Sequence, residues 1–206
     1  TAFAERVRMS TASELGTSYA AIGDPITALP LLEFARDEAM RLHPVTEESR
    51  AWVWLATGHA KLRLGDSAGA LADYERANLE ISRRVSRGEP LSVFSRNEQQ
   101  INRLWMANAF IEAGNRSEAI RIFDDVSVRF DLTQMVDTWI HAALPNIALA
   151  LSEVGRLADA ERVLSIAREQ SLKISGVDNG ALSDISVASA IMRSDTGQME
   201  SARTEL

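Results

Sequence analysis

Residues 54–77 read WLATGHAKLRLGDSAGALADYERA and contain a glycine between two runs of helix-forming residues. Gly58 lies seven residues before Gly65, Ala70 lies five residues after it, and Tyr74 lies nine residues after it. Alanine, leucine, arginine and glutamate favour helix, whereas glycine readily adopts the left-handed conformation that ends one. The stretch therefore predicts two helices that turn back on each other at Gly65.

The same arrangement recurs along the whole chain, at spacings of 42, 49, 41 and 42 residues between Gly23, Gly65, Gly114, Gly155 and Gly197. A small residue precedes each glycine by seven positions and an alanine follows it by five. In the first four units a large apolar or aromatic residue follows by nine. Small residues let antiparallel helices approach closely, and we expect the large residue to fill the gap between neighbouring hairpins. The repeat predicts an all-α solenoid of antiparallel helix hairpins with about ten helices.

The predicted hairpin units cover approximately residues 4–42, 48–87, 92–130, 133–174 and 180–206, and the last is incomplete. Gly88-Glu89-Pro90 is expected to end a long helix, and Pro145 is expected to bend the helix predicted over Met135 to Val154. The chain starts with Thr1 and stops within a hairpin, whose apolar face normally needs a cap. We therefore expect residues 1–206 to be a single array excised from a longer protein.

Composition limits the possible functions of this 206-residue chain. It has no cysteine, which excludes disulfide scaffolds, thiolate zinc sites and cysteine nucleophiles. Its net charge of -7 disfavours nucleic acid as a partner, because phosphate binding normally needs a basic face. No apolar run approaches the length of a membrane span, so we expect no membrane partner and a cytoplasmic location.

The repeat resembles the tetratricopeptide repeat (TPR) family, most clearly in Trp54, Gly58, Gly65-Asp66, Ala70, Tyr74 and Ala77. The period of about 42 residues exceeds the 34 of the standard repeat and is similar to that of kinesin light chains and of bacterial peptide-sensing regulators. The resemblance implies a right-handed superhelix whose concave groove is lined by the first helix of each hairpin.

By that resemblance, ten side chains are candidates to line a peptide-binding groove: Trp52, Leu55, His59, Arg63, Leu104, Trp105, Asn108, Glu112, Asn146 and Glu153. Asn108 and Asn146 match asparagines that bind a peptide backbone in several family members, since an amide both donates and accepts hydrogen bonds. The basic residues of a carboxylate clamp are missing, because Leu104, Asp184 and Ala188 stand in the corresponding places. Solvated polar helix faces are an equally good interpretation of both asparagines.

Catalytic motifs are missing from the sequence, which has no phosphate-binding glycine loop, nucleophile elbow or paired metal-binding histidines. We predict no catalytic residues, no metal site, no cofactor and no enzymatic activity. The sequence favours a non-enzymatic scaffold that binds a partner protein or peptide in its groove. Two alternatives stay open: a peptide-sensing regulatory region of a larger signalling or transcription-regulating protein, of bacterial origin by composition, and a self-association module that forms homo-oligomers.

Overall fold

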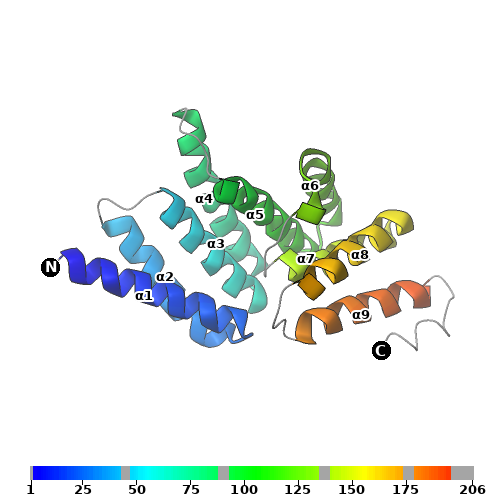
Figure 1. The fold of residues 1–206 in the computed structure, drawn as a ribbon, viewed down its shortest axis with the longest axis horizontal. Helices are drawn as coiled ribbons and strands as arrows, with labels where there is room; N and C mark the ends of the chain where they lie inside the picture. The colour runs from blue at the N-terminus through cyan, green and yellow to red at the C-terminus, as the bar shows by residue number, and fades with distance from the viewer. Residues whose placement is uncertain (1, 43–46, 88–92, 135–139, 174–178, 196–206) are drawn as a thin grey trace. The chain divides into compact units, whose positions relative to one another are not determined.

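A computed structural model describes residues 2–42, 47–87, 93–134, 140–173 and 179–195 of the chain. Within these ranges the backbone forms α-helices and one short 3-10 helix, without strands. In chain order they are α1 (Ala2–Ala21), α2 (Pro25–Arg41), α3 (Glu47–Arg63), α4 (Ser67–Ser86), α5 (Val93–Glu112), α6 (Arg116–Arg129), η1 (Leu132–Gln134), α7 (Ile140–Glu153), α8 (Leu157–Lys173) and α9 (Asn179–Asp195) (Figure 1). The all-α prediction is confirmed, and the expected tenth helix, after Gly197, falls outside the described residues.

The predicted glycine turns are present in all four described units. Gly23, Gly65, Gly114 and Gly155 have φ angles of 82°, 83°, 79° and 80°, in the left-handed region. Glycine adopts this conformation at little cost, whereas a Cβ would meet the backbone there. Each of these residues ends the first helix of a hairpin, as the sequence predicts. Gly197 lies outside the described residues.

Side chains that follow the turns cap the second helices. The amide of Thr27 donates to the Asp24 carboxylate at 3.0 Å, at the start of α2. The amide of Glu118 donates to the Asn115 side-chain oxygen at 3.3 Å, at the start of α6. Asp66 accepts in the same way, at 2.8 Å, from the third residue of α4. The turn and the cap are both local signals, which is why the sequence locates them to the residue.

Close approach of the two helices in a hairpin explains the small residue seven positions before each turn. A Cβ added to Gly58 would lie 2.7 Å from a ring carbon of Tyr74, and one added to Gly16 would lie 2.7 Å from Cγ of Leu32. Tyr74 and Leu32 are fully buried. The large residue therefore packs on the small residue of its own hairpin, a contact that the sequence analysis had expected between neighbouring hairpins.

The contacts among Cα atoms divide the chain into two compact units, Thr1–Ala113 and Gly114–Leu206. In the first unit α1 packs on α2 and α3 on α4, while α2 contacts α3 and α4 contacts α5. In the second unit α7 packs on α8, and both contact α9. The boundary falls at the turn after α5, inside the third predicted hairpin. A single array over residues 1–206 stays a prediction.

Pro145 lies inside α7, as the sequence predicts, and its side chain is buried. Residues 135–139 of the helix expected over Met135 to Val154 lie outside the described residues. Helix α4 ends at Ser86 and α5 begins at Val93, and Gly88-Glu89-Pro90, expected to end a long helix, lies outside the described residues.

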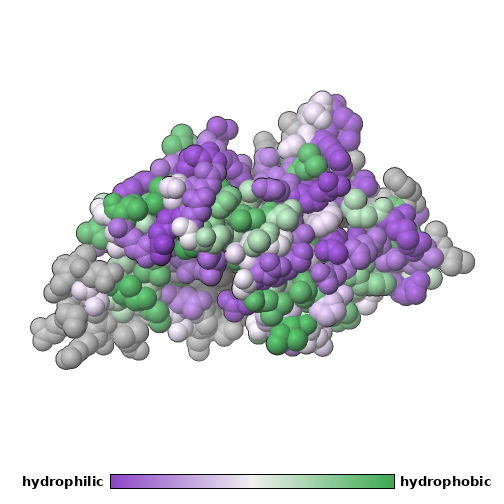
Figure 2. All heavy atoms as spheres, turned by 180° about the vertical axis from the view of Figure 1, so that it is seen from behind, coloured by the Kyte–Doolittle hydropathy of each residue, from purple (hydrophilic) through white to green (hydrophobic). Residues whose placement is uncertain are grey.

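Exposed apolar side chains are scattered on the surface. On the face shown in Figure 2, hydrophobic residues stand in separate patches among hydrophilic ones. The most exposed large apolar side chains include Phe3, Ile22, Ile26 and Val128. Single exposed apolar residues are ordinary in folded proteins, so these positions do not by themselves mark a site.

Candidate functional site

Four predicted groove residues occupy one face of α3 at helical spacing, because residues three or four apart in a helix are neighbours. Their side chains differ in how much of each is exposed to solvent. Leu55 is 3% exposed and His59 is 7% exposed, whereas Trp52 is half-buried and Arg63 is exposed. Trp52 and Arg63 are therefore accessible to a partner on α3, whereas Leu55 and His59 are buried.

The predicted residues of α5 are also mostly buried. Leu104 is 0% exposed, Trp105 1% and Asn108 4%, whereas Glu112 at the end of the helix is exposed. Leu55, Leu104 and Trp105 are buried hydrophobic residues of the first unit, in which α3 contacts α5. In this structure a partner cannot reach these three side chains, contrary to the expectation that they line an open groove.

His59 of α3 and Trp105 of α5 form a ring contact between these two helices. Their rings meet edge to face, with centroids 4.3 Å apart and an interplanar angle of 71°. Burial, together with the smaller effect of the nearby Arg63 charge, lowers the pKa of His59 to about 3. The imidazole is therefore neutral near pH 7, and its ring packs against the ring of Trp105.

Asn146 and Glu153, the remaining predicted residues, lie on α7 in the second unit. Asn146 is half-buried and directly follows Pro145 in the helix. Glu153 is exposed and forms an ion pair with Arg116 of α6, whose Nη2 also donates to Oε1 of Glu153 at 3.3 Å. A ligand that engages Glu153 therefore has to compete with this arginine.

The two candidate asparagines stand at different repeat positions. Asn108 precedes Gly114 by six residues, as His59 precedes Gly65, whereas Asn146 precedes Gly155 by nine residues. They also belong to different compact units. Their repeat positions therefore do not make them equivalent members of one clamp.

A charged cluster that the sequence analysis did not select joins α2, α3 and α4. Lys61 Nζ lies 2.7 Å from Asp73 Oδ2, and their side chains are 16% and 6% exposed. Next to this pair, the guanidinium carbons of Arg36 and Arg76 lie 5.2 Å and 6.0 Å from the centroid of the Trp54 ring. The sequence contains a signal for this cluster, because the oppositely charged Lys61 and Asp73 stand on either side of the turn glycine Gly65.

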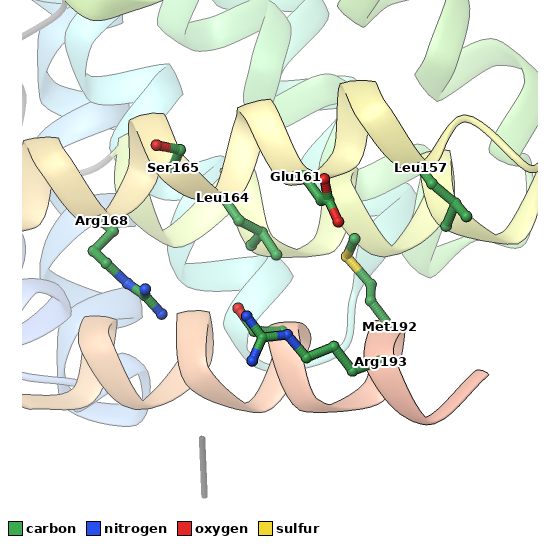
Figure 3. A pocket seen from close by; sticks show the side chains of 8 residues that line it. Leu157, Glu161, Leu164, Ser165, Arg168, Met192 and Arg193 are labelled. Atoms are coloured by element: carbon green, nitrogen blue, oxygen red, sulfur yellow. The ribbon is translucent and has the colours of Figure 1, made fainter. Parts of the chain in front are cut away.

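The second unit contains a pocket of about 490 Å³ between α8 and α9. Figure 3 shows side chains from both helices directed into it, and its lining residues are Leu157, Glu161, Leu164, Ser165, Arg168, Ser189, Met192 and Arg193. None of these residues was predicted as a site residue. Two arginines beside leucine and methionine form a lining suited to an amphipathic segment that carries a carboxylate.

Across the described ranges, His, Asp and Glu residues form no group of three or more that could hold a metal ion. Among the same residues, no helix combines the length and the apolar character needed to cross a bilayer.

Comparison with known proteins identifies the fold. No protein-family model matches the sequence, and neither does any curated protein. Among solved structures, two crystal structures of TPR-like repeats from Podosopora anserina, described as nearly identical repeats of a kinesin light chain, align with TM-scores of 0.60 and 0.59. One of the two is of a variant. In each case the identity is 17%, over 96% of this chain and 91% of that chain. The chain therefore has the fold of TPR-like helix hairpins, which confirms the resemblance seen in the sequence.

Proposed function

We propose that the chain is a protein-interaction module that binds a segment of a partner protein across the first helices of the hairpins in the first unit. The observation that carries the proposal is the contact of α1 with α3 and of α3 with α5. Because the first helices of three successive hairpins lie next to one another, their outward faces form one surface. TPR-like hairpins are stacked units, which makes such a surface rigid before a partner arrives.

The accessible side chains of this surface give it chemical character. Trp52 is half-buried and supplies a rigid aromatic anchor, while Arg63 and Glu112 are exposed and carry opposite charges. Tryptophan and arginine are the residues that most often dominate binding energy at protein interfaces. The buried rings of His59 and Trp105 hold this surface in place from below. The preferred ligand is thus an extended peptide with an apolar side chain flanked by a carboxylate.

Selection of peptides from a displayed random library against the chain tests the proposal. For a selected peptide, we expect Trp52→Ala and Arg63→Ala each to raise the Kd at least about tenfold, which corresponds to about 1.4 kcal/mol. Glu75→Ala, at an exposed site on α4, is the matched control and should leave the Kd unchanged. Peptides that bind equally well to both surface variants would contradict the proposed location.

The asparagine clamp stays a separate proposal with its own variants. Asn146 is half-buried on α7, whereas Asn108 is almost fully buried on α5. If an amide binds the peptide backbone, Asn146→Ala should weaken capture while the helical circular dichroism stays unchanged. Asn108→Ala tests the same role in the first unit, with a urea midpoint as the measure of any structural effect. Equal affinity for free-acid and amidated peptides is expected, since the basic residues of a carboxylate clamp are missing.

A further inference from the structure

The pocket between α8 and α9 is lined by one face of each helix. Its residues recur every three or four positions, which brings them to the same side of a helix. On α8 they include Leu157, Glu161, Leu164 and Arg168, and on α9 they are Ser189, Met192 and Arg193. The two helices contact each other within the second unit, so one small ligand can touch both faces.

The buried part of this lining is mostly apolar. Leu164 of α8 and Met192 of α9 are buried, and the buried hydroxyl residue Ser189 stands one turn from Met192 in the same helix. A ligand that places apolar side chains here removes them from water, which favours binding. The volume of about 490 Å³ is in the range of pockets that hold small organic ligands.

The charged residues of the lining change sign along the pocket. Glu161 and Arg168 are exposed, and Arg193 is half-buried. In Figure 3 the side chains of Arg168 and Arg193 extend toward one another in the space between the two helices. Glu161 stands two helical turns before Arg168 and one turn after Leu157. One end of the pocket is therefore cationic, and the other end carries a carboxylate.

These charges fit the two ends of a zwitterion. Arginine binds a carboxylate through paired N–H donors, and a glutamate carboxylate accepts hydrogen bonds from an ammonium group. Arg168 and Arg193 both have other interactions within the chain. Each guanidinium has five N–H donors, so a ligand carboxylate can bind beside those interactions. The pocket thus offers partners for both charged ends of a ligand and apolar surface between them.

The spacing along α8 sets the length of such a ligand. Glu161 and Arg168 are seven residues apart, which corresponds to about 10.5 Å at a rise of about 1.5 Å per residue. An extended peptide advances about 3.3–3.6 Å per residue, so three residues span about 10 Å. A single amino acid carries both charges on one carbon atom, which holds them too close together to reach both ends of the pocket.

We propose that the pocket between α8 and α9 binds an apolar tripeptide with free ends. Its carboxylate lies between the guanidinium groups of Arg168 and Arg193, and its ammonium group lies at the Glu161 carboxylate. Its side chains cover Leu164 and Met192. The site belongs to the second unit, whereas the partner-binding surface proposed above belongs to the first, so each can be tested without the other. The need for free ends concerns this pocket alone and not a longer peptide bound by an asparagine.

Titration calorimetry of the full chain with trileucine tests the ligand class. Trileucine with an acetylated amino end and trileucine with an amidated carboxyl end should each bind at least about tenfold more weakly, because each loses one charged contact. Triglycine keeps both charged ends but has no apolar side chains, so it should also bind more weakly than trileucine.

Two variants assign the ends of the peptide. Arg168→Gln should weaken trileucine binding and remove most of the preference for a free carboxylate, while the preference for a free amino end remains. Glu161→Gln should show the opposite pattern, because each variant is coupled only to the end that it contacts. A variant that merely damaged the fold would weaken the free and the capped peptides alike. Arg162→Gln, at an exposed arginine of α8 outside the lining, is the matched control and should bind trileucine as the natural chain does.

Any of three results would overturn the inference. No binding of trileucine at millimolar concentration would show that the pocket does not accept such a peptide. Equal affinity for the free and the capped tripeptides would show that the charged ends are not recognised. Binding that is unchanged in Arg168→Gln and in Glu161→Gln but lost in Trp52→Ala would place the tripeptide on the surface of the first unit.

Discussion

Gly58→Ala is the substitution whose effect follows most directly from the hairpin geometry. The added Cβ would lie 2.7 Å and 2.9 Å from two ring carbons of Tyr74 and 3.2 Å from the Ala70 carbonyl oxygen. Tyr74 is 0% exposed, so its ring cannot move without displacing other core atoms. Overpacking of this kind costs about 1–3 kcal/mol, and two contacts below van der Waals distance place the cost near the upper end.

Helix propensity acts in the opposite direction. Alanine is favoured over glycine by about 1 kcal/mol in a helix interior, so the net loss of unfolding free energy should be about 2 kcal/mol. Urea denaturation followed by tryptophan fluorescence measures it, since Trp52, Trp54 and Trp105 all lie in the first unit. With an m-value of about 2 kcal/mol/M, the midpoint should fall by about 1 M.

Two further variants separate the clash from other effects. Ala72→Gly, at an exposed site on α4, measures the propensity term alone and should lose about 1 kcal/mol. Combining Gly58→Ala with Tyr74→Leu removes the ring that the new methyl group meets, so the two changes should cost less together than the sum of their separate costs. A Gly58→Ala chain as stable as the natural one would refute the close-approach explanation of the repeat.

Two other predictions concern buried ionisable groups of the first unit. Because the pKa of His59 is about 3 in the folded protein and about 6.5 unfolded, the unfolded state binds the proton first. The free energy of unfolding should therefore fall between pH 6.5 and pH 3, by at most about 1.4 kcal/mol per pH unit, and His59→Gln should flatten urea midpoints measured across that range. For the buried pair, Lys61→Met should cost up to about 3 kcal/mol by leaving the Asp73 carboxylate without its ammonium partner, whereas Lys61→Met with Asp73→Leu should cost less in thermal unfolding. Equal losses for the single and double variants would contradict this interpretation of the pair.

The turns and caps were predictable from sequence because they depend on a few adjacent residues. A glycine at positive φ and an aspartate that accepts an amide proton three residues later require no information about distant parts of the chain. The repeat located the small and the large residue of each hairpin, but the large residue was expected to fill the gap between neighbouring hairpins. The structure shows instead that the two residues meet within one hairpin, at Gly16 and Gly58.

The candidate site was less predictable, since helical spacing assigns residues to a face but does not say what covers that face. Leu55, Trp105 and Arg63 all belonged to the predicted surface, yet two are in the core and one is exposed. Their depth depends on how α5 packs against α3. Residues that line a groove and residues that pack between two helices both recur every three or four positions, so the sequence could not distinguish an open groove from a packed interface.

The helical hairpin, its turns and the register of the repeat can be read from the amino acids, because they are set by local conformational preference repeated at a regular interval. Which side chains a partner can reach, and which charges are buried, depends on how the helices pack. It made His59 a neutral packed ring, paired Lys61 with Asp73, and formed a pocket with two arginines between α8 and α9. Burial and charge depend on neighbours that come together only when the helices pack, and these properties also define the surfaces available for binding.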